Sequence, residues 1–111
     1  VMNRLIIPTN HVHIRTTPFW TKKSAPANIW KRHLDKGTRP GVYPRLCVMQ
    51  GTICYYGYAD ETSPDPVNII TINAGEFAVF PPEKWHRIEA MSDDTVFNID
   101  FYVDPAILME E

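Results

Sequence analysis

Long hydrophobic runs, clustered basic residues and closely spaced cysteines are all missing from this sequence. No apolar run approaches the roughly 18 residues of a membrane-spanning helix, so we expect no membrane segment. The 11 Lys and Arg residues are outnumbered by 13 Asp and Glu residues, and the resulting net charge of −2 disfavours nucleic-acid or anionic-membrane surfaces. The N-terminal stretch VMNRLIIPTNHV has a short apolar patch, broken by Pro8, and lacks the core of a signal peptide. We therefore expect a soluble, cytoplasmic protein.

The two cysteines, Cys47 and Cys54, are too few for a secreted disulfide scaffold and too far apart for a CxxC pair. If Gln50 and Gly51 form a two-residue hairpin turn, the cysteines lie opposite each other on adjacent strands. We interpret them as small buried apolar residues, the alternative being a dithiol that meets soft oxidants or metals. The five glycines form no GxGxxG loop, which argues against a nucleotide site of that kind.

Short strands are the secondary structure that the remaining sequence predicts. Apolar residues alternate or run in short pieces between turn signals such as LDKGTRPG and MSDD, and the ten prolines disfavour helices. We expect a single all-β domain over residues 1–111, folded as a sandwich, jelly roll or closed barrel, with one helical turn after Pro105. The expected strands are Val12–Thr16, Ala27–His33, Val42–Gln50, Thr52–Tyr58, Val67–Ile72, Glu76–Phe80, Trp85–Ala90 and Thr95–Val103.

The stretch GEFAVFPPEKWH, from Gly75 to His86, carries the most informative motif. A strand-like run stops at a double proline, and His86 follows at the start of the next strand. The spacing of Gly75, Pro81 and His86 resembles the second sequence motif of cupins, with Glu83 in place of a glycine. The resemblance implies a cupin-like double-stranded β-helix, a jelly-roll barrel in which this histidine faces inward and binds a metal. Strand parity agrees, because His86 shares a face with Ile88.

A wider resemblance covers the chain from about His13 to Glu110. The segments HIRTTPFWTKKSAPANIWKRH, GVYPRLCVMQG, YGYADE and AGEFAVFPPEKWHRIEAMSDDTVFNIDFYVDPAILME together resemble the TehB/YeaR-like family. These are small cupin-like bacterial proteins, also found as the N-terminal domain of tellurite-resistance TehB proteins. The resemblance implies a cytoplasmic protein linked to tellurite or nitrosative and oxidative stress. It implies no known reaction, and the methyltransferase domain of the two-domain members has no counterpart in these 111 residues.

A divalent metal in such a barrel takes imidazole and carboxylate ligands, so we expect a site held by His33, His86 and Glu83. His33 ends the strand-like NIWKRH, and Glu83 lies on the loop that leads to His86. Asp35 could replace the second histidine of the first cupin motif, although a turn role also suits it. Asp100 is a reserve, since the apolar alternation around it predicts that it faces outward. The cofactor is then a divalent ion such as zinc, iron, manganese or nickel.

The sequence gives less support for a binding role of other polar residues. Tyr43 and Arg45 open the strand after the long loop and, at a barrel mouth, could orient an anionic ligand through paired donors and a hydroxyl. The alternative is a surface stripe shared with Cys47. His11 and His13 alternate near the N-terminus, where nothing adjacent completes a metal site.

The aromatic residues are too many for the inner layer of one small barrel. Some must lie on an outer face, and exposed aromatic patches usually mark an interface, so we expect a homodimer formed through sheet faces or exchanged N-terminal strands. The aromatic residues concerned are Phe19, Trp20, Trp30, Tyr55, Tyr56, Tyr58, Trp85 and Tyr102.

The predicted function follows from these parts. We expect a small metal-binding cupin of the stress response that binds a small anion or an oxygen-containing ligand at the histidine and carboxylate site, with or without turnover. The alternative is a non-catalytic dimeric binding or sensor module whose site is vestigial. Partners among nucleic acids and membranes are not expected.

Overall fold

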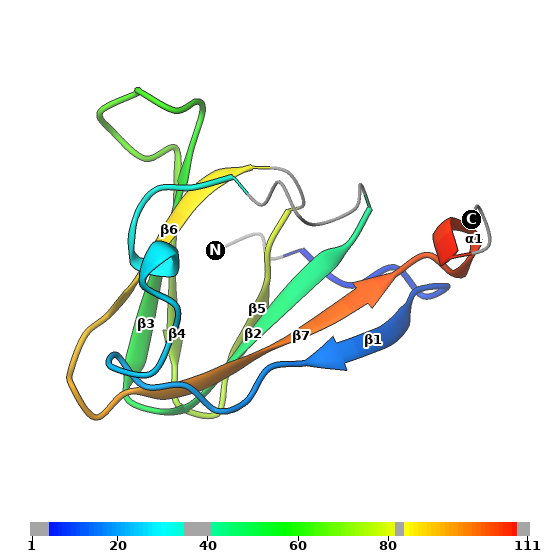
Figure 1. Cartoon of the computed structure of the whole chain (residues 1–111). Helices are drawn as coiled ribbons and strands as arrows, with labels where there is room; N and C mark the ends of the chain where they lie inside the picture. Colours follow the sequence, from blue (N-terminus) through cyan, green and yellow to red (C-terminus); the bar gives the residue numbers. More distant parts are fainter. Residues whose placement is uncertain (1–4, 35–40, 82–83, 109–111) are drawn as a thin grey trace.

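Two antiparallel β-sheets, packed face to face, make up the protein. The computed structural model describes residues 5–34, 41–81 and 84–108. One sheet has four strands in the order β1-β7-β2-β5, and the other has three in the order β4-β3-β6 (Figure 1). The elements are β1 (Val12–Thr16), η1 (Ala27–Trp30), β2 (Tyr43–Gln50), β3 (Thr52–Tyr58), β4 (Asn68–Asn73), β5 (Phe77–Val79), β6 (Trp85–Ala90), β7 (Val96–Val103) and α1 (Pro105–Leu108).

The prediction of an all-β chain is confirmed, and so is the helical turn at Pro105. The strands described do not close into one barrel, because each sheet keeps its own hydrogen-bonded partners. No helix within the described ranges is long and apolar enough to cross a bilayer.

The expected strand Ala27–His33 is wrong. Pro26, with φ of −55° and ψ of 134°, instead precedes the 3-10 helix η1. Proline has no N–H to donate to a strand ladder, and the turn that follows lets Ile29 and Trp30 pack against the core. The chain is extended again at Lys31, with φ of −108° and ψ of 152°, and His33 then forms an isolated bridge with His86.

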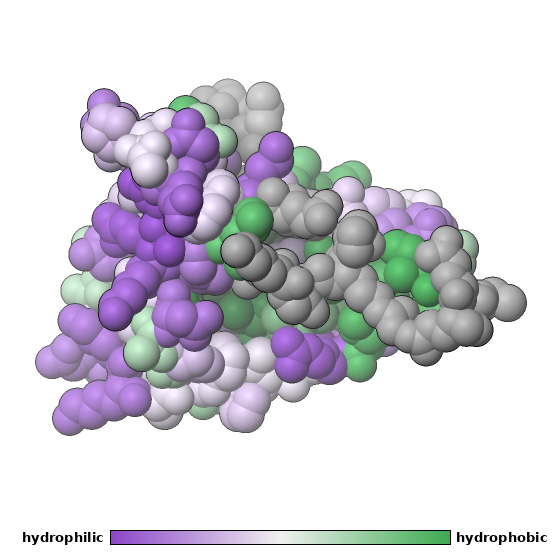
Figure 2. All heavy atoms as spheres, turned by 45° about the horizontal axis from the view of Figure 1, so that its top comes forward, coloured by the Kyte–Doolittle hydropathy of each residue, from purple (hydrophilic) through white to green (hydrophobic). Residues whose placement is uncertain are grey.

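The core lies between the sheets, where the apolar face of each strand is buried. Along β2 the buried residues Pro44, Leu46 and Val48 alternate with half-buried ones, the pattern of a strand with one face in a core. Tyr55 of β3 stacks on Phe80 with ring centroids 4.2 Å apart. Figure 2 shows hydrophilic side chains gathered over the side of the three-stranded sheet, with hydrophobic ones nearer the middle of the molecule.

The cysteine hairpin is also a wrong prediction, because β2 and β3 belong to different sheets. Cys47 lies opposite Asn98 of β7, whereas Cys54 lies opposite Thr71 of β4. Gly51 carries the chain from one sheet to the other in a left-handed conformation with φ of +76°. The two free thiols are therefore on the outer faces of opposite sheets, too separated in the fold for a joint dithiol site.

Candidate functional site

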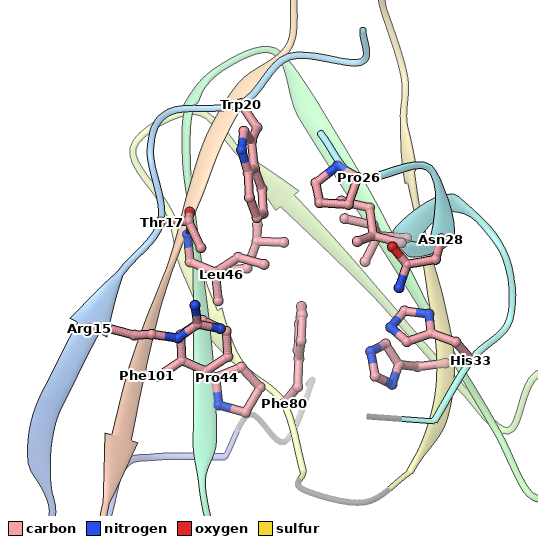
Figure 3. A pocket seen from close by; sticks show the side chains of 14 residues that line it. Arg15, Thr17, Trp20, Pro26, Asn28, His33, Pro44, Leu46, Phe80 and Phe101 are labelled. Carbon is pink, nitrogen blue, oxygen red and sulfur yellow. Dashed lines mark hydrogen bonds between the residues drawn. The ribbon is translucent and has the colours of Figure 1, made fainter. Parts of the chain in front are cut away.

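A cavity of about 180 Å³ lies between the two sheets and is the candidate site (Figure 3). Strands of both sheets, the segment after β1 and η1 contribute to its walls, so it exists only in the folded sandwich. Most of its lining is apolar, with a few polar groups, as is usual for small-molecule sites. The lining residues are Arg15, Thr17, Trp20, Pro26, Asn28, Ile29, His33, Pro44, Leu46, Phe80, His86, Ile88, Ile99 and Phe101.

Two predicted ligands, His33 and His86, meet in this cavity. Each donates its backbone N–H to the other's carbonyl, with N···O distances of 2.9 and 3.0 Å. Their imidazole rings lie with centroids 4.4 Å apart. His86 is only 7% exposed and His33 is half-buried. The inward orientation that strand parity predicts for His86 is thus what the structure has.

The Nδ1 atom of each ring is hydrogen-bonded to a backbone carbonyl. The Nδ1 atom of His33 lies 2.9 Å from the carbonyl oxygen of Lys31, and that of His86 lies 2.7 Å from the carbonyl oxygen of Lys84. A carbonyl oxygen only accepts, so each Nδ1 carries a proton, and Nε2 is the nitrogen with which each ring could bind a metal ion. Metal-ligating histidines are typically oriented by such a bond from the non-ligating nitrogen. The pair therefore fits the chemistry of a metal centre.

The two candidate carboxylates of the predicted site, Glu83 and Asp35, lie outside the described residues. Within the part of the chain that the structure describes, no three His, Cys, Asp or Glu side chains are grouped so that they could hold a metal ion. The described donor set is the two imidazoles.

Asp100 faces away from the cavity, on the outer face of β7, as its strand parity predicts. It accepts hydrogen bonds from Thr16 Oγ1 and from Arg45 Nη2, both at 2.6 Å, and is 9% exposed. Burial would raise the pKa of Asp100, but the hydrogen bond from Thr16 and the Arg45 guanidinium outweigh it and hold the pKa below its usual value. His13 lies on the same side, with Nε2 3.8 Å from the carboxylate. Asp100 is thus the acceptor of an ion-pair network and not a cavity ligand.

Tyr43 and Arg45 occupy the same outer face. Residues alternate along β2, and Pro44 and Leu46 are the ones that line the cavity. The guanidinium of Arg45 is bound to Asp100 and lies 5.2 Å from the ring centroid of Tyr102. The structure therefore separates both predicted ligand-binding residues from the two histidines.

Arg15, an exposed residue of β1, is a charged cavity residue that sequence reasoning missed. Strict alternation along β1 would put it on the face of His13, which is the outer face. The register instead shifts between these residues, so that His13 pairs with Tyr102 and Arg15 pairs with Phe101. Such an irregularity commonly redirects one side chain next to a site. The sequence does not predict this register shift, because Ile14, the residue between His13 and Arg15, is typical of an ordinary strand.

Outside the cavity, an arginine and tyrosine cluster holds the two histidine segments together. The Arg32 guanidinium lies over the Tyr58 ring at 3.5 Å, and its Nη1 donates to the carbonyl of Glu61 at 2.8 Å. Arg87 Nε donates to the Tyr58 hydroxyl at 3.1 Å. Arg32 and Arg87 are the neighbours of His33 and His86 in the chain, so this cluster restrains both backbones from the outer side.

Comparison with known proteins places the chain in a family. The sequence model of the TehB-like domain matches residues 15–99. The chain belongs to the TehB-like family. It is 68% identical over 106 residues to the uncharacterized protein YeaR of Escherichia coli (strain K12), which covers 96% of this chain and 89% of YeaR. The predicted family resemblance is confirmed.

More distant similarity links this TehB-like domain to larger proteins. It is 31% identical over 85 residues to the probable S-adenosyl-L-methionine-dependent methyltransferase TehB of Haemophilus influenzae (strain 10810), covering 77% of the chain but only 28% of that TehB. The methyltransferase description therefore concerns TehB as a whole protein.

Solved structures show the same fold. A crystal structure of an E. coli (strain K12) protein superposes with a TM-score of 0.88 at 68% identity, covering 91% of this chain and 98% of that one. The crystal structure of TehB from Haemophilus influenzae gives a TM-score of 0.72 at 25% identity, covering 86% of this chain and 32% of TehB.

Proposed function

We propose that the chain is a cupin-type jelly roll that binds one divalent metal ion through Nε2 of His33 and of His86. The observation that carries this proposal is the paired geometry of the two imidazoles, 4.4 Å apart in a cavity and each held at Nδ1 by a backbone carbonyl. The cupin assignment is supported by the two facing antiparallel sheets and by the inward placement of His86 at the spacing of the cupin motif.

A carboxylate completes the proposed ligand set, with Glu83 as the first candidate and Asp35 as its substitute. Imidazole and carboxylate donors together suit zinc, iron, manganese or nickel. When bound, such an ion supplies a Lewis acid with open positions for a small anion or an oxygen-containing ligand. The chain's own residues hold the ion, and the apolar walls limit the water around it.

The proposed role is binding or sensing in the response to tellurite or nitrosative and oxidative stress, and it rests on membership of the TehB-like family. In the described lining of the cavity, the groups of the usual proton-transfer type are the two imidazoles, and the carboxylate of the proposed ligand set would be a third. Thr17 donates its hydroxyl hydrogen to the carbonyl of Pro18 at 2.9 Å. Its hydroxyl oxygen also accepts the N–H of Ile99 at 3.0 Å, so it serves the backbone. A cytoplasmic location belongs to the same proposal.

Elemental mass spectrometry on tag-free protein tests the metal site. We expect about one equivalent of metal, lost in both His33→Ala and His86→Ala, with His11→Ala as the matched control because His11 lies outside the cavity. Circular dichroism on each variant separates loss of the ligand from loss of the fold. Absence of metal in the unmodified protein, even after incubation with zinc, iron, manganese or nickel, would falsify the metal proposal.

A further inference from the structure

Arg15 differs from the other described arginines in what its guanidinium contacts. Arg45 pairs with the carboxylate of Asp100, Arg87 donates to the Tyr58 hydroxyl, and Arg32 donates to a backbone carbonyl. Among the described residues, by contrast, no ion pair or side-chain hydrogen bond joins Arg15 to another residue. A cation at a cavity wall without a protein acceptor leaves its donors for water or for a ligand.

The orientation of Arg15 is nevertheless restrained. Its guanidinium carbon lies 4.3 Å from the ring centroid of Phe101, its cross-strand neighbour after the register shift. The aromatic ring covers one face of the planar guanidinium, while the five N–H donors lie in the guanidinium plane. In Figure 3 the side chain reaches from β1 across to Phe101, on the side of the cavity opposite His33. The donors can therefore bind a carboxylate by a paired, bidentate contact.

The walls of the cavity decide what kind of anion fits. Trp20, Leu46, Phe80 and Ile88 are apolar, and an inorganic oxyanion bound at Arg15 has no apolar part to bury against them. A carboxylate with a short apolar tail matches both parts of the cavity. The volume of about 180 Å³ suits a small molecule.

We propose that Arg15 recognises the carboxylate of a small monocarboxylate whose apolar tail fills the cavity between the sheets. The head group is bound on the β1 side, and the tail lies against Trp20 and Phe80 and extends toward the histidine pair. This inference deepens the proposed function by naming a ligand class for the same cavity. It does not depend on the metal for the binding of the head group.

Titrations with butanoate and butanamide test the proposal, because these probes have the same size and shape and differ in charge. Binding to metal-free protein is followed by the amide chemical shifts of residues that line the cavity. We expect butanoate to bind more tightly than butanamide, and Arg15→Gln to weaken butanoate by about tenfold or more, the usual contribution of a hydrogen bond to a charged group. Butanamide binding stays unchanged in that variant.

The controls separate local recognition from general electrostatics. Lys23→Gln removes the same charge from an exposed residue outside the cavity and leaves butanoate binding unchanged. Arg15→Lys keeps the charge but not the planar fork, and it restores only part of the affinity. Equal binding of the two probes, an Arg15→Gln variant that binds butanoate as the unmodified chain does, or nitrate that binds as tightly as butanoate overturns the proposal.

Failure of this inference and failure of the metal proposal give different results. Butanoate binding that depends on Arg15 in a chain without metal affinity overturns the metal proposal alone. Metal that is bound through the histidines, with butanoate insensitive to Arg15, overturns the carboxylate proposal alone.

Discussion

Asp100 is the residue whose replacement should cost the fold most on the outer face of the four-stranded sheet. Its side chain is 12% exposed, and it accepts two hydrogen bonds of 2.6 Å, one from Thr16 and one from Arg45. The Nε atom of Arg45 is buried and has no hydrogen-bond partner in the described part of the chain. Asp100→Ala would therefore leave a partly buried guanidinium without its counter-ion.

The magnitude follows from the two bonds and from the exposure of Arg45. A hydrogen bond to a charged group contributes about 1.5–3 kcal/mol, and two bonds to one carboxylate do not add fully. Because the Arg45 side chain is 30% exposed, water restores part of the loss. We expect Asp100→Ala to lower the free energy of unfolding at pH 7 by about 2–3 kcal/mol. At about 4 °C per kcal/mol for a domain of this size, the Tm falls by about 10 °C.

The pH dependence has a definite sign. The folded pKa of Asp100 lies below its usual value, so the stabilisation is fully present above the unfolded pKa and is lost as the pH falls through the folded pKa. The difference between the unmodified chain and Asp100→Ala should thus be largest near neutral pH. It should shrink below about pH 4, where the carboxylate begins to be protonated in the unfolded chain.

Urea denaturation followed by tryptophan fluorescence at pH 7 and at pH 3 measures both quantities. Asp93→Ala is the matched control, since the Asp93 side chain is 89% exposed in its pair with Lys22 and its loss should change stability by no more than about 0.5 kcal/mol. A cost of Asp100→Ala no greater than that of the control at pH 7 contradicts the predicted contribution of the ion pair. Equal costs at pH 3 and at pH 7 contradict the predicted pH dependence.

Two further predictions concern the turn at Gly51 and the assembly. Gly51→Ala places a methyl group 2.5 Å from Thr95 Oγ1 in a left-handed turn, whereas at Gly75, with φ of +85°, the methyl meets nothing within 4 Å. Gly75→Ala should lower the free energy of unfolding by about 1–2 kcal/mol from backbone strain alone. Gly51→Ala should lower it by at least about 1 kcal/mol more, because its methyl group also meets Thr95. Urea denaturation measures both values, and equal costs contradict the predicted contact with Thr95. The homodimer stays a prediction, and the exposed apolar side chains of Ile6 and Phe77, 79% and 52% exposed, are consistent with an interface. Light scattering after size exclusion should give a mass of twice 12.8 kDa. A 12.8 kDa species at micromolar concentration refutes the homodimer.

Alternation predicted the strands well wherever one face of a strand packs on the core. In β2, β3 and β6 the buried residues recur at every second position, and this is the pattern that a period of two reports. The segment Ala27–His33 looks similar in composition, but its apolar residues reach the core from a turn and not from a ladder. Composition alone does not separate these two ways of burying Ile29 and Trp30.

The candidate site was also predictable only in part. His86 was predictable because its inward direction follows from its neighbours along one strand. Arg15 was not, because its direction depends on which residue of β7 it pairs with, and that register is a property of two strands together. Arg45 looked equally suitable in the sequence, yet its parity with Cys47 puts it on the outer face, beside Asp100.

The site is complete only while the His33 segment stays paired with β6 through the bridge between His33 and His86. The bridge joins them by two backbone hydrogen bonds, while the Arg32 guanidinium stacks over Tyr58 on the outer side. Local unfolding of the His33 segment would separate the rings and expose both backbone amides to exchange with solvent. Any ion or molecule that contacts both rings binds only the docked arrangement, so its binding free energy adds to the protection of these two amides. The hydrogen-exchange rates of the His33 and His86 amides therefore measure how fully the cavity is occupied.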